Sequence, residues 1–258
     1  ATGNLTITVD HKDINVTIGE GAEGAQVTEA GLATGTTAGT GAATGWLVIN
    51  LPAGTTVATG TFEGTNGTLE VRDNGNGTYS YQYTLHTALN HGAGDMAEDA
   101  ESFTLAIADA HGNTGLATIK VDVADDKPTI SVTASGNSIE GMTETLIARI
   151  DVTFGADGQG GYLINGNPAT YNNGEFTFAD ANGSYRITAT GDVFFTAASN
   201  NPANFGLEIS AVDGDGDIVA ATGNLTITVD HKDINVTIGE GAEGAQVTEA
   251  GLATGTAS

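Results

Sequence analysis

Three aspartates alternate with glycine at Asp213, Asp215 and Asp217, and this spacing is the clearest sign of chemistry in the sequence. Carboxylates two residues apart can converge on one hard cation, because the intervening glycines relieve the backbone. Calcium is the expected ion, since it prefers several oxygen ligands. An EF-hand uses the same local chemistry, but it needs a longer loop, flanking helices and a distal glutamate, which this stretch lacks.

A weaker version of the same loop lies at Asp109, His111 and Asn113. Imidazole is a poor calcium ligand, so we expect His111 to point away or to offer only its carbonyl oxygen. His86 and His91 suggest a separate transition-metal pair, but their five-residue spacing among glycine and asparagine indicates a loop instead.

Further carboxylates lie where we expect modules to join or loops to cluster. Aspartates occur in the predicted linkers, glutamates follow the first strand of each predicted module, and two acidic residues precede a penultimate strand. These additional candidate calcium ligands are Glu20, Glu140, Asp99, Glu101, Asp125, Asp126, Asp10, Asp13, Asp230 and Asp233. Aspartate–glycine runs are also ordinary turn formers, so a simple solvated loop stays open as the alternative at each place. The recurrence of acidic loops at matching places in both modules favours calcium.

The charge balance supports this interpretation. The 258 residues include 32 acidic and 7 basic side chains, which give a formal net charge of −25. Such an excess of negative charge argues against nucleic acid, whose affinity comes from Lys and Arg on phosphates, and against an anionic membrane surface. The surface also repels itself, so bound cations should favour the folded state.

The chain contains no cysteine and no apolar run long enough to span a membrane. A secreted vertebrate domain would often contain disulfides. A cysteine-free, acidic sequence rich in Gly, Thr and Asp suits an exported bacterial protein instead. We therefore expect an extracellular or cell-surface location and no insertion into a membrane.

Residues 1–36 and 221–256 are identical, so the sequence repeats with an offset of 220 residues. We expect the chain to be a window of a longer array with a two-module repeat. Each module should contact its neighbouring repeats within a monomer. The predicted segments are the closing strand of a preceding module (1–12), module one (13–126), module two (127–231) and the start of a further copy of module one (232–258).

Short alternating strands separated by turn signals recur in units of about 100 residues, without helical periodicity of useful length. This pattern predicts an all-β fold of tandem immunoglobulin-like, cadherin-like β-sandwiches. More specific predictions are a central buried strand at 46–51, hairpins across 68–85 and 175–189, an acidic loop at 95–101 and one continuous strand at 205–212.

Motifs for catalysis are missing from the sequence. Gly-x-Ser-x-Gly does not occur, the glycine-rich stretch 155–161 lacks the Lys-Ser/Thr of a phosphate loop, and a single tryptophan gives little basis for sugar stacking. We therefore expect no enzyme. Two alternatives to a passive spacer stay open: an adhesin module that binds sugar or protein through the loops 33–45 and 155–173, and an accessory domain of a polysaccharide-active enzyme.

Two stretches resemble a known family. The segments IADAHGNTGLATIKVDVADDKPTI (107–130) and AVDGDGDIVAATGNLTITV (211–229) both contain an acidic loop followed by an alternating strand, and the first continues into an Asp-Asp-x-Pro linker. They are similar to the closing halves of repeats in giant type I-secreted RTX adhesins of Gram-negative bacteria, the LapA-like biofilm adhesins and their VCBS or cadherin-like relatives.

This chain departs from the family pattern at His111 and Asn113, and the linker that follows Asp230 lacks the proline. The resemblance implies extender domains that are made rigid by Ca²⁺. Such domains hold a distal ligand-binding region away from the cell surface for attachment and biofilm formation.

Overall fold

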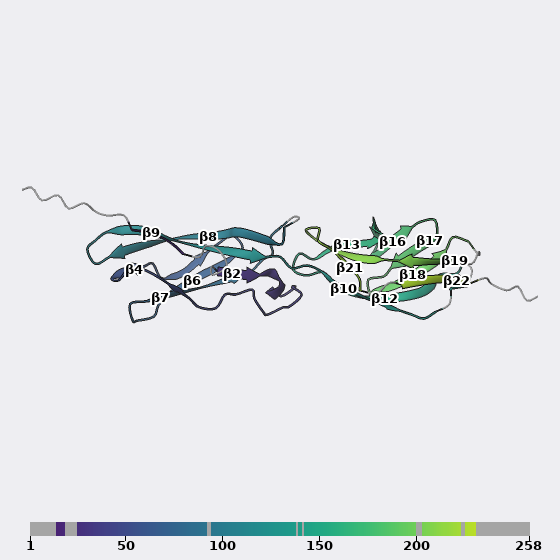
Figure 1. The fold of residues 1–258 in the computed structure, drawn as a ribbon, viewed down its shortest axis with the longest axis horizontal. Coiled ribbons are helices and arrows are strands. Elements are labelled where there is room, and N and C mark those ends of the chain that lie inside the picture. The colour runs from purple at the N-terminus through teal and green to yellow at the C-terminus, as the bar shows by residue number, and fades with distance from the viewer. Residues whose placement is uncertain are drawn as a thin grey trace, which may run out of the picture.

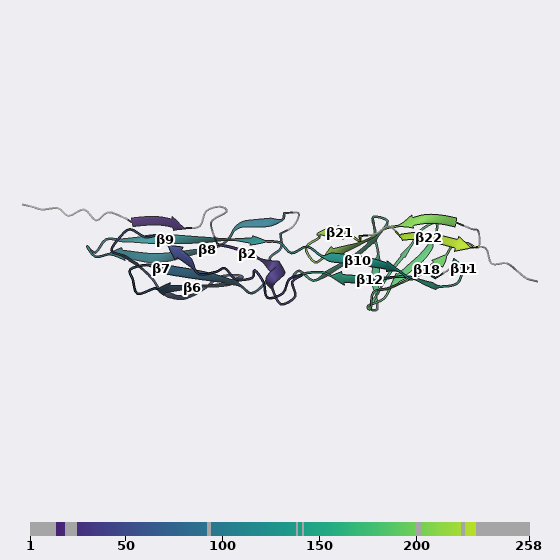
Figure 2. The ribbon, with the colours of Figure 1, turned by 60° about the horizontal axis from the view of Figure 1, so that its bottom comes forward.

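Two β-sandwiches lie end to end and form a long, narrow molecule, as Figure 1 and Figure 2 show. The computed structural model describes residues 14–18, 25–91, 94–137, 139–140, 142–199, 203–222 and 225–230. The strand expected within 1–12 and the partial copy expected at 232–258 lie outside the described residues. Apart from one 3-10 turn, η1 (Glu29–Gly31), every regular element described is a β-strand, and no described helix is long and apolar enough to cross a membrane. The prediction of all-β, tandem immunoglobulin-like sandwiches is confirmed.

Five strands form the first sheet of the first sandwich: β1 (Ile14–Ile18), β2 (Ala25–Thr28), β4 (Thr55–Val57), β8 (Met96–Asp109) and β9 (Thr114–Ala124). β9 pairs with antiparallel β8 along one edge, and β4 extends the sheet beyond β8. Along its other edge β9 pairs with two parallel strands, β1 and then β2. β9 therefore runs the length of this sandwich and ends at the linker to the next one.

Four strands form the facing sheet: β3 (Leu47–Ile49), β5 (Gly60–Glu63), β6 (Gly67–Asp73) and β7 (Tyr79–Leu85), in the order β3-β7-β6-β5. The first predicted hairpin is confirmed as β6 and β7. Asp73 Oδ1 accepts a hydrogen bond from the backbone N of Gly75 at 2.8 Å, and Gly75 has a φ of 77°, which glycine adopts without strain.

Alternate residues of the two sheets point inward, as the pleat of a strand requires, and form the core of the first sandwich. Its largest fully buried side chains are Tyr81, Tyr83, Leu69, Leu105, Ile107 and Ile119. Truncating a buried aromatic side chain of this kind to alanine costs about 3–5 kcal/mol. The sandwich therefore has a core of its own.

Six antiparallel strands form one side of the second sandwich. In spatial order they are β10 (Thr129–Ala134), β12 (Thr145–Thr153), β18 (Asp192–Ala197), β17 (Gly183–Ile187), β16 (Glu175–Ala179) and β15 (Thr170–Asn172). The second predicted hairpin is confirmed as β16 and β17. Asp180 shapes its turn by accepting a hydrogen bond from the backbone N of Asn182 at 2.9 Å.

Two smaller sheets complete the second sandwich. The first contains β13 (Gln159–Ile164), β14 (Asn167–Pro168), β20 (Ile209–Asp213) and β21 (Ile218–Ala220), and the second contains β11 (Ile139–Glu140), β19 (Ala203–Leu207) and β22 (Leu225–Asp230). Their inward residues join those of the large sheet in a second core, which includes Tyr162, Ile164, Tyr185, Ile187, Phe195 and Ile209. The β20–β21 turn is the predicted acidic loop.

Three predictions about single strands are wrong. The run 46–51 is an edge rather than a central strand, because β3 pairs only with β7 among the described strands and Val48 is 57 % exposed. Residues 96–101 begin β8 and contain a register shift between Ala97 and Glu101, so they are not a loop. The run 205–212 divides at Glu208 between β19 and β20, which belong to different sheets. Hydrophobicity alone does not specify which strands pair.

The linker 125–128 and the loops around it position the candidate site. From the first sandwich, η1 and the β7–β8 connection reach the linker. From the second, the β12–β13 and β20–β21 loops reach it. Thr28 Oγ1 accepts a hydrogen bond from the backbone N of Ala30 at 3.3 Å and caps η1, whose first residue, Glu29, is completely buried.

Candidate metal centre between the two sandwiches

Six acidic side chains from both sandwiches and the linker meet at the junction. Each has a buried carboxylate oxygen with no hydrogen-bond partner among the described residues. Burying an unpaired carboxylate is costly, so each such atom calls for a ligand, a proton or an ion. We refer to these six residues as the junction cluster: Glu29, Asp125, Asp157, Asp213, Asp215 and Asp217.

The β20–β21 loop supplies three members of the junction cluster. Asp213 Oδ1 accepts hydrogen bonds from the backbone N of Gly216 at 3.0 Å and of Asp217 at 2.7 Å. The backbone N of Asp213 donates to the carbonyl oxygen of Asp217 at 3.1 Å, which closes the turn. Asp213 is only 2 % exposed, and its Oδ2 is among the unpartnered atoms. The loop thus uses one oxygen of Asp213 for its own structure and leaves the other buried.

Asp215 reaches across the junction from the second sandwich to the first. Its Oδ2 accepts a hydrogen bond from the backbone N of His91 at 3.1 Å, while its Oδ1 is buried without a partner in the described part of the chain. One carboxylate therefore both joins the two sandwiches and offers a free oxygen to the cluster.

Asp126 lies beside the junction cluster and fastens the two sandwiches together. Its Oδ2 accepts hydrogen bonds from the backbone N of Thr36 at 2.9 Å and of Ala156 at 3.0 Å, and its Oδ1 accepts one from the hydroxyl of Thr36. A Cβ on Gly155 would lie 2.8 Å from Asp126 Oδ2, and the φ of Gly155 is +81°, so this position requires glycine. Both oxygens of Asp126 are already occupied by these structural contacts.

Burial and mutual repulsion raise the pKa values of the junction cluster. Burial raises the pKa of Glu29 to about 8, and the charges of Asp157 and Asp125 act in the same direction. Burial also raises the pKa of Asp213 and that of Asp125 to about 6, with contacts to other aspartates of the cluster adding to it. The pKa of Asp157 is likewise raised, mainly by burial. The cluster therefore favours either protons or a cation.

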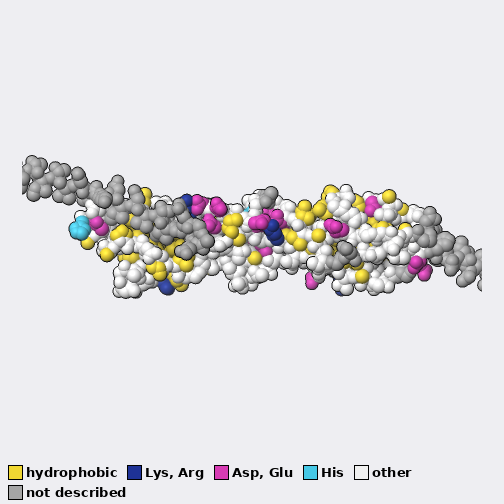
Figure 3. Space-filling model, viewed as in Figure 1, with side chains coloured by type: hydrophobic (Ala, Val, Ile, Leu, Met, Phe, Trp, Pro, Cys, Tyr) yellow, Lys and Arg dark blue, Asp and Glu magenta, His cyan; other side chains and the backbone are white. Residues whose placement is uncertain are grey.

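Among the described residues, positive charge at the junction is scarce. Lys127 Nζ lies 3.5 Å from Asp217 Oδ2, but it also pairs with Asp95 Oδ1 at 2.5 Å, and its side chain is 46 % exposed. Figure 3 shows acidic and basic side-chain atoms close together near the middle of the molecule. A surface ion pair of this kind contributes little stability, so it offsets only part of the buried negative charge.

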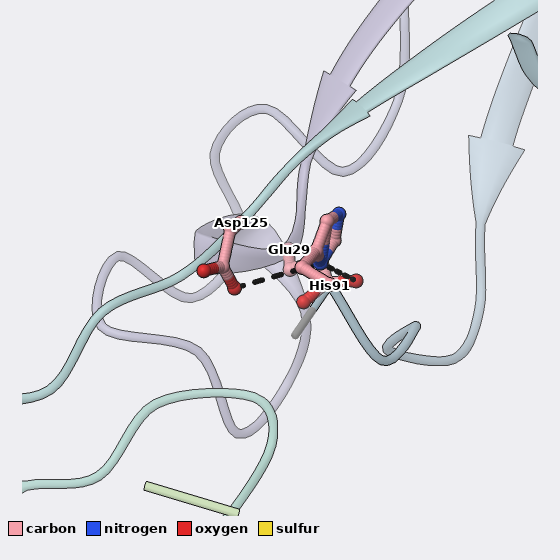
Figure 4. Close-up of side chains that lie close together, drawn as sticks. All are labelled: Glu29, His91 and Asp125. Carbon is pink, nitrogen blue, oxygen red and sulfur yellow. Dashed lines mark ion pairs between the residues drawn. The ribbon is translucent and has the colours of Figure 1, made fainter. Parts of the chain in front are cut away.

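His91 is the nitrogen-bearing neighbour of the cluster. Its Nδ1 lies 3.7 Å from Glu29 Oε1 and 3.6 Å from Asp125 Oδ1, and Figure 4 shows the ring against both carboxylates. The side chains of His91 and Glu29 are 0 % exposed and that of Asp125 is 1 % exposed. Glu29 Oε1 also accepts a hydrogen bond from the backbone N of Leu89 at 2.6 Å.

Two groups of three side chains at this junction could each hold a metal ion, because the ligand atoms within each group lie within 4.8 Å of one another. The first group is Asp125, Asp157 and Asp215, and the second is Glu29, His91 and Asp125. The first group offers only oxygen, as hard cations such as Ca²⁺ require. The buried, unpartnered oxygens of the same residues show that the donor set suits a cation. The junction is therefore an acidic cluster that could bind a metal ion.

The predicted ligands from the first sandwich lie elsewhere. Asp109 and Asn113 form the β8–β9 turn, at the end of β9 away from the linker. Asp99 pairs with Lys120 Nζ at 2.6 Å. Glu101 is buried and accepts hydrogen bonds from two backbone N–H groups of the turn between β5 and β6. These side chains are not part of the junction cluster.

The remaining predicted ligands belong to the far end of the second sandwich or are not described. Glu140 and Asp230 are paired in the parallel register of β11 and β22. Of the predicted set, the structure brings together Asp125, Asp126, Asp213, Asp215 and Asp217 at one junction. Glu20, Asp10, Asp13 and Asp233 lie outside the described residues.

Sequence reasoning missed Glu29, His91 and Asp157. Glu29 directly follows the short strand β2, and Asp157 lies in the glycine-rich loop at 155–161, where an isolated acid between small residues is the only local signal. The sequence indicates a loop at His91, and this is correct, but the loop places the ring of His91 at the junction. The three residues lie far apart in sequence, so no spacing rule links them.

No family model matches the sequence, and no curated protein matches it. Solved structures of extracellular domains do match, at low identity. The protocadherin gamma B4 extracellular domain is 14 % identical, with a TM-score of 0.26, over 87 % of this chain and 32 % of that one. Mouse clustered PcdhgC3 EC1-3 is 12 % identical, with a TM-score of 0.27, over 86 % of this chain and 66 % of that one.

The Yersinia pseudotuberculosis adhesin InvE is 18 % identical, with a TM-score of 0.25, over 69 % of this chain and 50 % of that one. The chain thus spans less than two thirds of the length of each of these structures. Because all three TM-scores are below 0.5, we infer nothing about fold or function from these likenesses.

Proposed function

We propose that this chain is a calcium-stiffened spacer segment of a large bacterial surface adhesin of the type I-secreted RTX class. In this role it acts outside the cell and projects a distal ligand-binding region for surface attachment and biofilm formation. The observation that carries the proposal is the junction cluster, in which unpartnered carboxylate oxygens of both sandwiches and the linker are buried together. A spacer needs its joints to be stiff, and this is the joint between its two rigid parts.

Calcium would be held first by Asp125, Asp157 and Asp215, the all-oxygen group, with Asp213 and Asp217 beside them. The ion would supply the positive charge that these carboxylates lack. Two like charges 4 Å apart repel by about 4 kcal/mol at an effective dielectric constant near 20, so the metal-free junction is strained by its own charge. Because these carboxylates belong to both sandwiches, neutralising them would make the joint resist bending and would stabilise the folded state.

The repeated sequence extends the proposal from one joint to an array. Residues 221–256 repeat residues 1–36, so a module-one copy is expected to follow module two. The boundaries 13–126 and 127–231 remain part of the proposal. Further calcium ligands at the joint between module two and the next copy of module one are also part of the proposal. They are Glu20, Glu140, Asp10, Asp13, Asp230 and Asp233. Identical copies in tandem favour a spacer, because extension increases with every repeat.

The test compares the whole chain in calcium and in EGTA. We expect EGTA to lower the melting temperature and to broaden the range of inter-sandwich angles measured by small-angle X-ray scattering. Calcium at a thousand times its Kd would stabilise the folded state by about 4 kcal/mol. The double variant Asp157→Asn/Asp215→Asn should lose both responses, whereas Asp99→Asn, whose partner is Lys120, should keep them. Scattering profiles that coincide with and without calcium would contradict the proposal.

A hollow of about 390 Å³ in the second sandwich favours a second candidate function, ligand binding by the module itself. Phe154, Tyr162, Phe176 and Tyr171 follow one another along it, with successive ring centroids 5.5, 5.1 and 4.9 Å apart. Tyr171 is 61 % exposed, and polar side chains such as Asp151 share the lining. An exposed ring beside polar groups suits a sugar.

A glycan array separates this candidate from the spacer. Binding of a glycan by the wild-type chain that is lost in Tyr171→Ala would support a sugar site. The control is Val48→Ala, because Val48 is an exposed apolar residue of the first sandwich. A buried residue such as Tyr79 would not serve, since its truncation would affect folding. An array with no bound glycan, or equal binding by all three proteins, would contradict the sugar site.

A further inference from the structure

Two contacts fix His91, one to its imidazole and one to its main chain. Its Nε2 lies 3.1 Å from the carbonyl oxygen of Val123, and its backbone N donates to Asp215 Oδ2 at 3.1 Å. A carbonyl oxygen can only accept, so Nε2 has to donate the proton of this hydrogen bond. Fixing the proton on Nε2 leaves Nδ1 as the free nitrogen of the neutral ring, which is how proteins commonly prepare a histidine to bind a metal.

The free nitrogen faces two carboxylates at distances that do not match hydrogen bonds. Nδ1 lies 3.7 Å from Glu29 Oε1 and 3.6 Å from Asp125 Oδ1, both beyond the usual hydrogen-bond range (Figure 4). Nδ1 and Glu29 Oε2 are buried and have no hydrogen-bond partner within the described ranges. Ligands about 2.0–2.2 Å from one shared ion lie about 3.3–3.6 Å apart in a tetrahedral arrangement, close to the spacing seen here.

From this geometry we propose that Glu29, His91 and Asp125 form a second metal position, which takes a borderline divalent cation such as Zn²⁺ rather than Ca²⁺. The donor set decides the class of ion. Imidazole and carboxylate together suit zinc and its neighbours in the first transition row, whereas calcium takes oxygen ligands. Because the chain has no cysteine, no thiolate can be a ligand here. The nitrogen ligand of this position is the imidazole of His91.

Asp125 belongs to both groups of ligands, so the two positions are adjacent and share a carboxylate. Glu29 and His91 come from the first sandwich, Asp125 from the linker, and Asp157 and Asp215 from the second sandwich. Zinc would therefore fix the linker to the first sandwich, and calcium would fix the linker to the second. The inference uses the same junction as the proposed function, but it does not require calcium to bind.

A protonated His91 that acts as an internal counter-ion is the competing explanation. In that state Nδ1 would have a proton with no acceptor within hydrogen-bond distance, although two carboxylates are nearby. An unsatisfied charged donor buried beside possible acceptors is an unfavourable arrangement. A lone pair directed at a shared cation accounts for the same distances without this cost.

The test titrates ZnCl2 into the whole chain in saturating calcium and follows heat and melting temperature. We expect zinc to raise the melting temperature of the wild type, and His91→Gln to weaken zinc binding at least about tenfold. His111→Gln is the matched control, because it removes an imidazole 3.8 Å from a carboxylate on an exposed turn, and it should bind zinc as the wild type does. Equal zinc affinity in His91→Gln and the wild type would overturn the inference.

A second readout does not depend on the folding of any variant. In the nitrogen NMR spectrum of the wild type, zinc should move the Nδ1 resonance of His91 and leave the Nε2 proton in place. A His91 ring that is unchanged by zinc, or that is an imidazolium at neutral pH, would also overturn the inference. Scattering that is insensitive to calcium would refute the proposed spacer joint, whereas the zinc response of His91 would stand by itself.

Discussion

The Asp109 loop of the first sandwich and the Asp213 loop of the second have the same backbone design. In each, the backbone N of the first aspartate donates to the carbonyl oxygen of the fifth residue, at 2.9 Å from Asp109 to Asn113 and at 3.1 Å from Asp213 to Asp217. In each, Oδ1 of the first aspartate accepts a hydrogen bond from the backbone N of the fifth residue, at 2.9 Å and 2.7 Å. Both loops join consecutive antiparallel strands.

The loops differ in how the second oxygen of the first aspartate is used. Asn113 Nδ2 donates to Asp109 Oδ2 at 2.7 Å, whereas Asp213 Oδ2 is buried and unpartnered in the described structure. The pKa of Asp109 is accordingly lowered, chiefly by the side-chain hydrogen bond from Asn113, whereas burial raises the pKa of Asp213 to about 6. An amide at the fifth position closes the loop, and a carboxylate at the same position leaves it short of a cation.

The largest effect that separates the two loops should be the pH dependence of the metal-free protein. Asp213 has a pKa of about 6 when folded against 3.8 as its ordinary value, and Glu29 has about 8 against 4.5. The folded state therefore binds more protons than the unfolded state between these values, and stability falls as the pH rises from about 4 to 8. One pKa unit corresponds to about 1.4 kcal/mol, so we expect a loss of about 3 kcal/mol or more from the cluster.

Asp109 contributes to the pH dependence of stability with the opposite sign, because its pKa is lowered. Its contribution is present above the ordinary value of 3.8 and is lost only as the pH falls below it. Urea unfolding in EGTA at several pH values measures the slope. The variant Glu29→Gln should flatten it, and Asp109→Asn should leave it unchanged between pH 5 and 8. Calcium should remove most of this dependence of stability on pH. A metal-free protein that becomes more stable between pH 5 and 8 would refute the raised pKa values of the junction cluster.

The second effect concerns the acceptor that closes each loop. Asp213→Ala removes the partner of two backbone N–H groups, those of Gly216 and Asp217, and also removes a carboxylate from the cluster. In calcium we expect a loss of about 2–3 kcal/mol, because hydrogen bonds to charged groups are the strong ones. In EGTA the loss should be smaller, since the same substitution relieves repulsion.

Asp109→Ala is the matched substitution in the first sandwich. It removes the acceptor of the backbone N of His111 and of Asn113, but no junction charge. Its cost should therefore be the same in calcium and in EGTA. Thermal unfolding of both variants in the two buffers gives the comparison. A calcium-dependent cost for Asp109→Ala, or a calcium-independent one for Asp213→Ala, would show that the two loops are functionally alike.

Local patterns predicted much of the fold but not the pairing of every strand. The hairpin of β6 and β7 follows from alternating aromatic residues around an Asp-Asn-Gly turn, and the structure confirms it. The prediction of a central strand at 46–51 is wrong because β3 pairs only with β7 among the described strands, and the guanidinium of Arg72 covers the neighbouring Trp46 at 3.6 Å from the ring centroid. A surface cation can cover an aromatic ring beside an edge strand, and hydropathy does not reveal this.

The candidate site likewise has a part that the sequence predicts and a part that it does not. The spacing of Asp213, Asp215 and Asp217 is a local property, and the sequence predicted that the three carboxylates share a loop. Glu29 and His91 join them only because the two sandwiches meet end to end, an arrangement that depends on contacts such as the one between His91 N and Asp215 Oδ2. No periodicity or motif encodes a contact between residues that lie 124 positions apart.

The smallest effect should come from exchanging the fifth residues of the two loops. Asp217→Asn places an amide where Asn113 stands in the other loop, so it can donate to Asp213 Oδ2, and it removes one charge from the cluster. We expect the metal-free protein to gain about 1 kcal/mol, the net worth of one hydrogen bond, while its calcium-induced shift in melting temperature shrinks. Losing the 3.5 Å contact with Lys127 should matter little, because that lysine is half exposed and keeps Asp95.

Asn113→Asp is the reciprocal change, and it should lower stability in EGTA because Asp109 Oδ2 loses its donor and gains a like charge. Melting curves of both variants in EGTA and in calcium measure the exchange. If Asp217→Asn destabilises the metal-free protein as much as Asn113→Asp does, the fifth residue does not decide between a closed turn and a metal-binding loop. Opposite signs in EGTA, with a reduced calcium response only in Asp217→Asn, would locate the difference between the loops in one amide group.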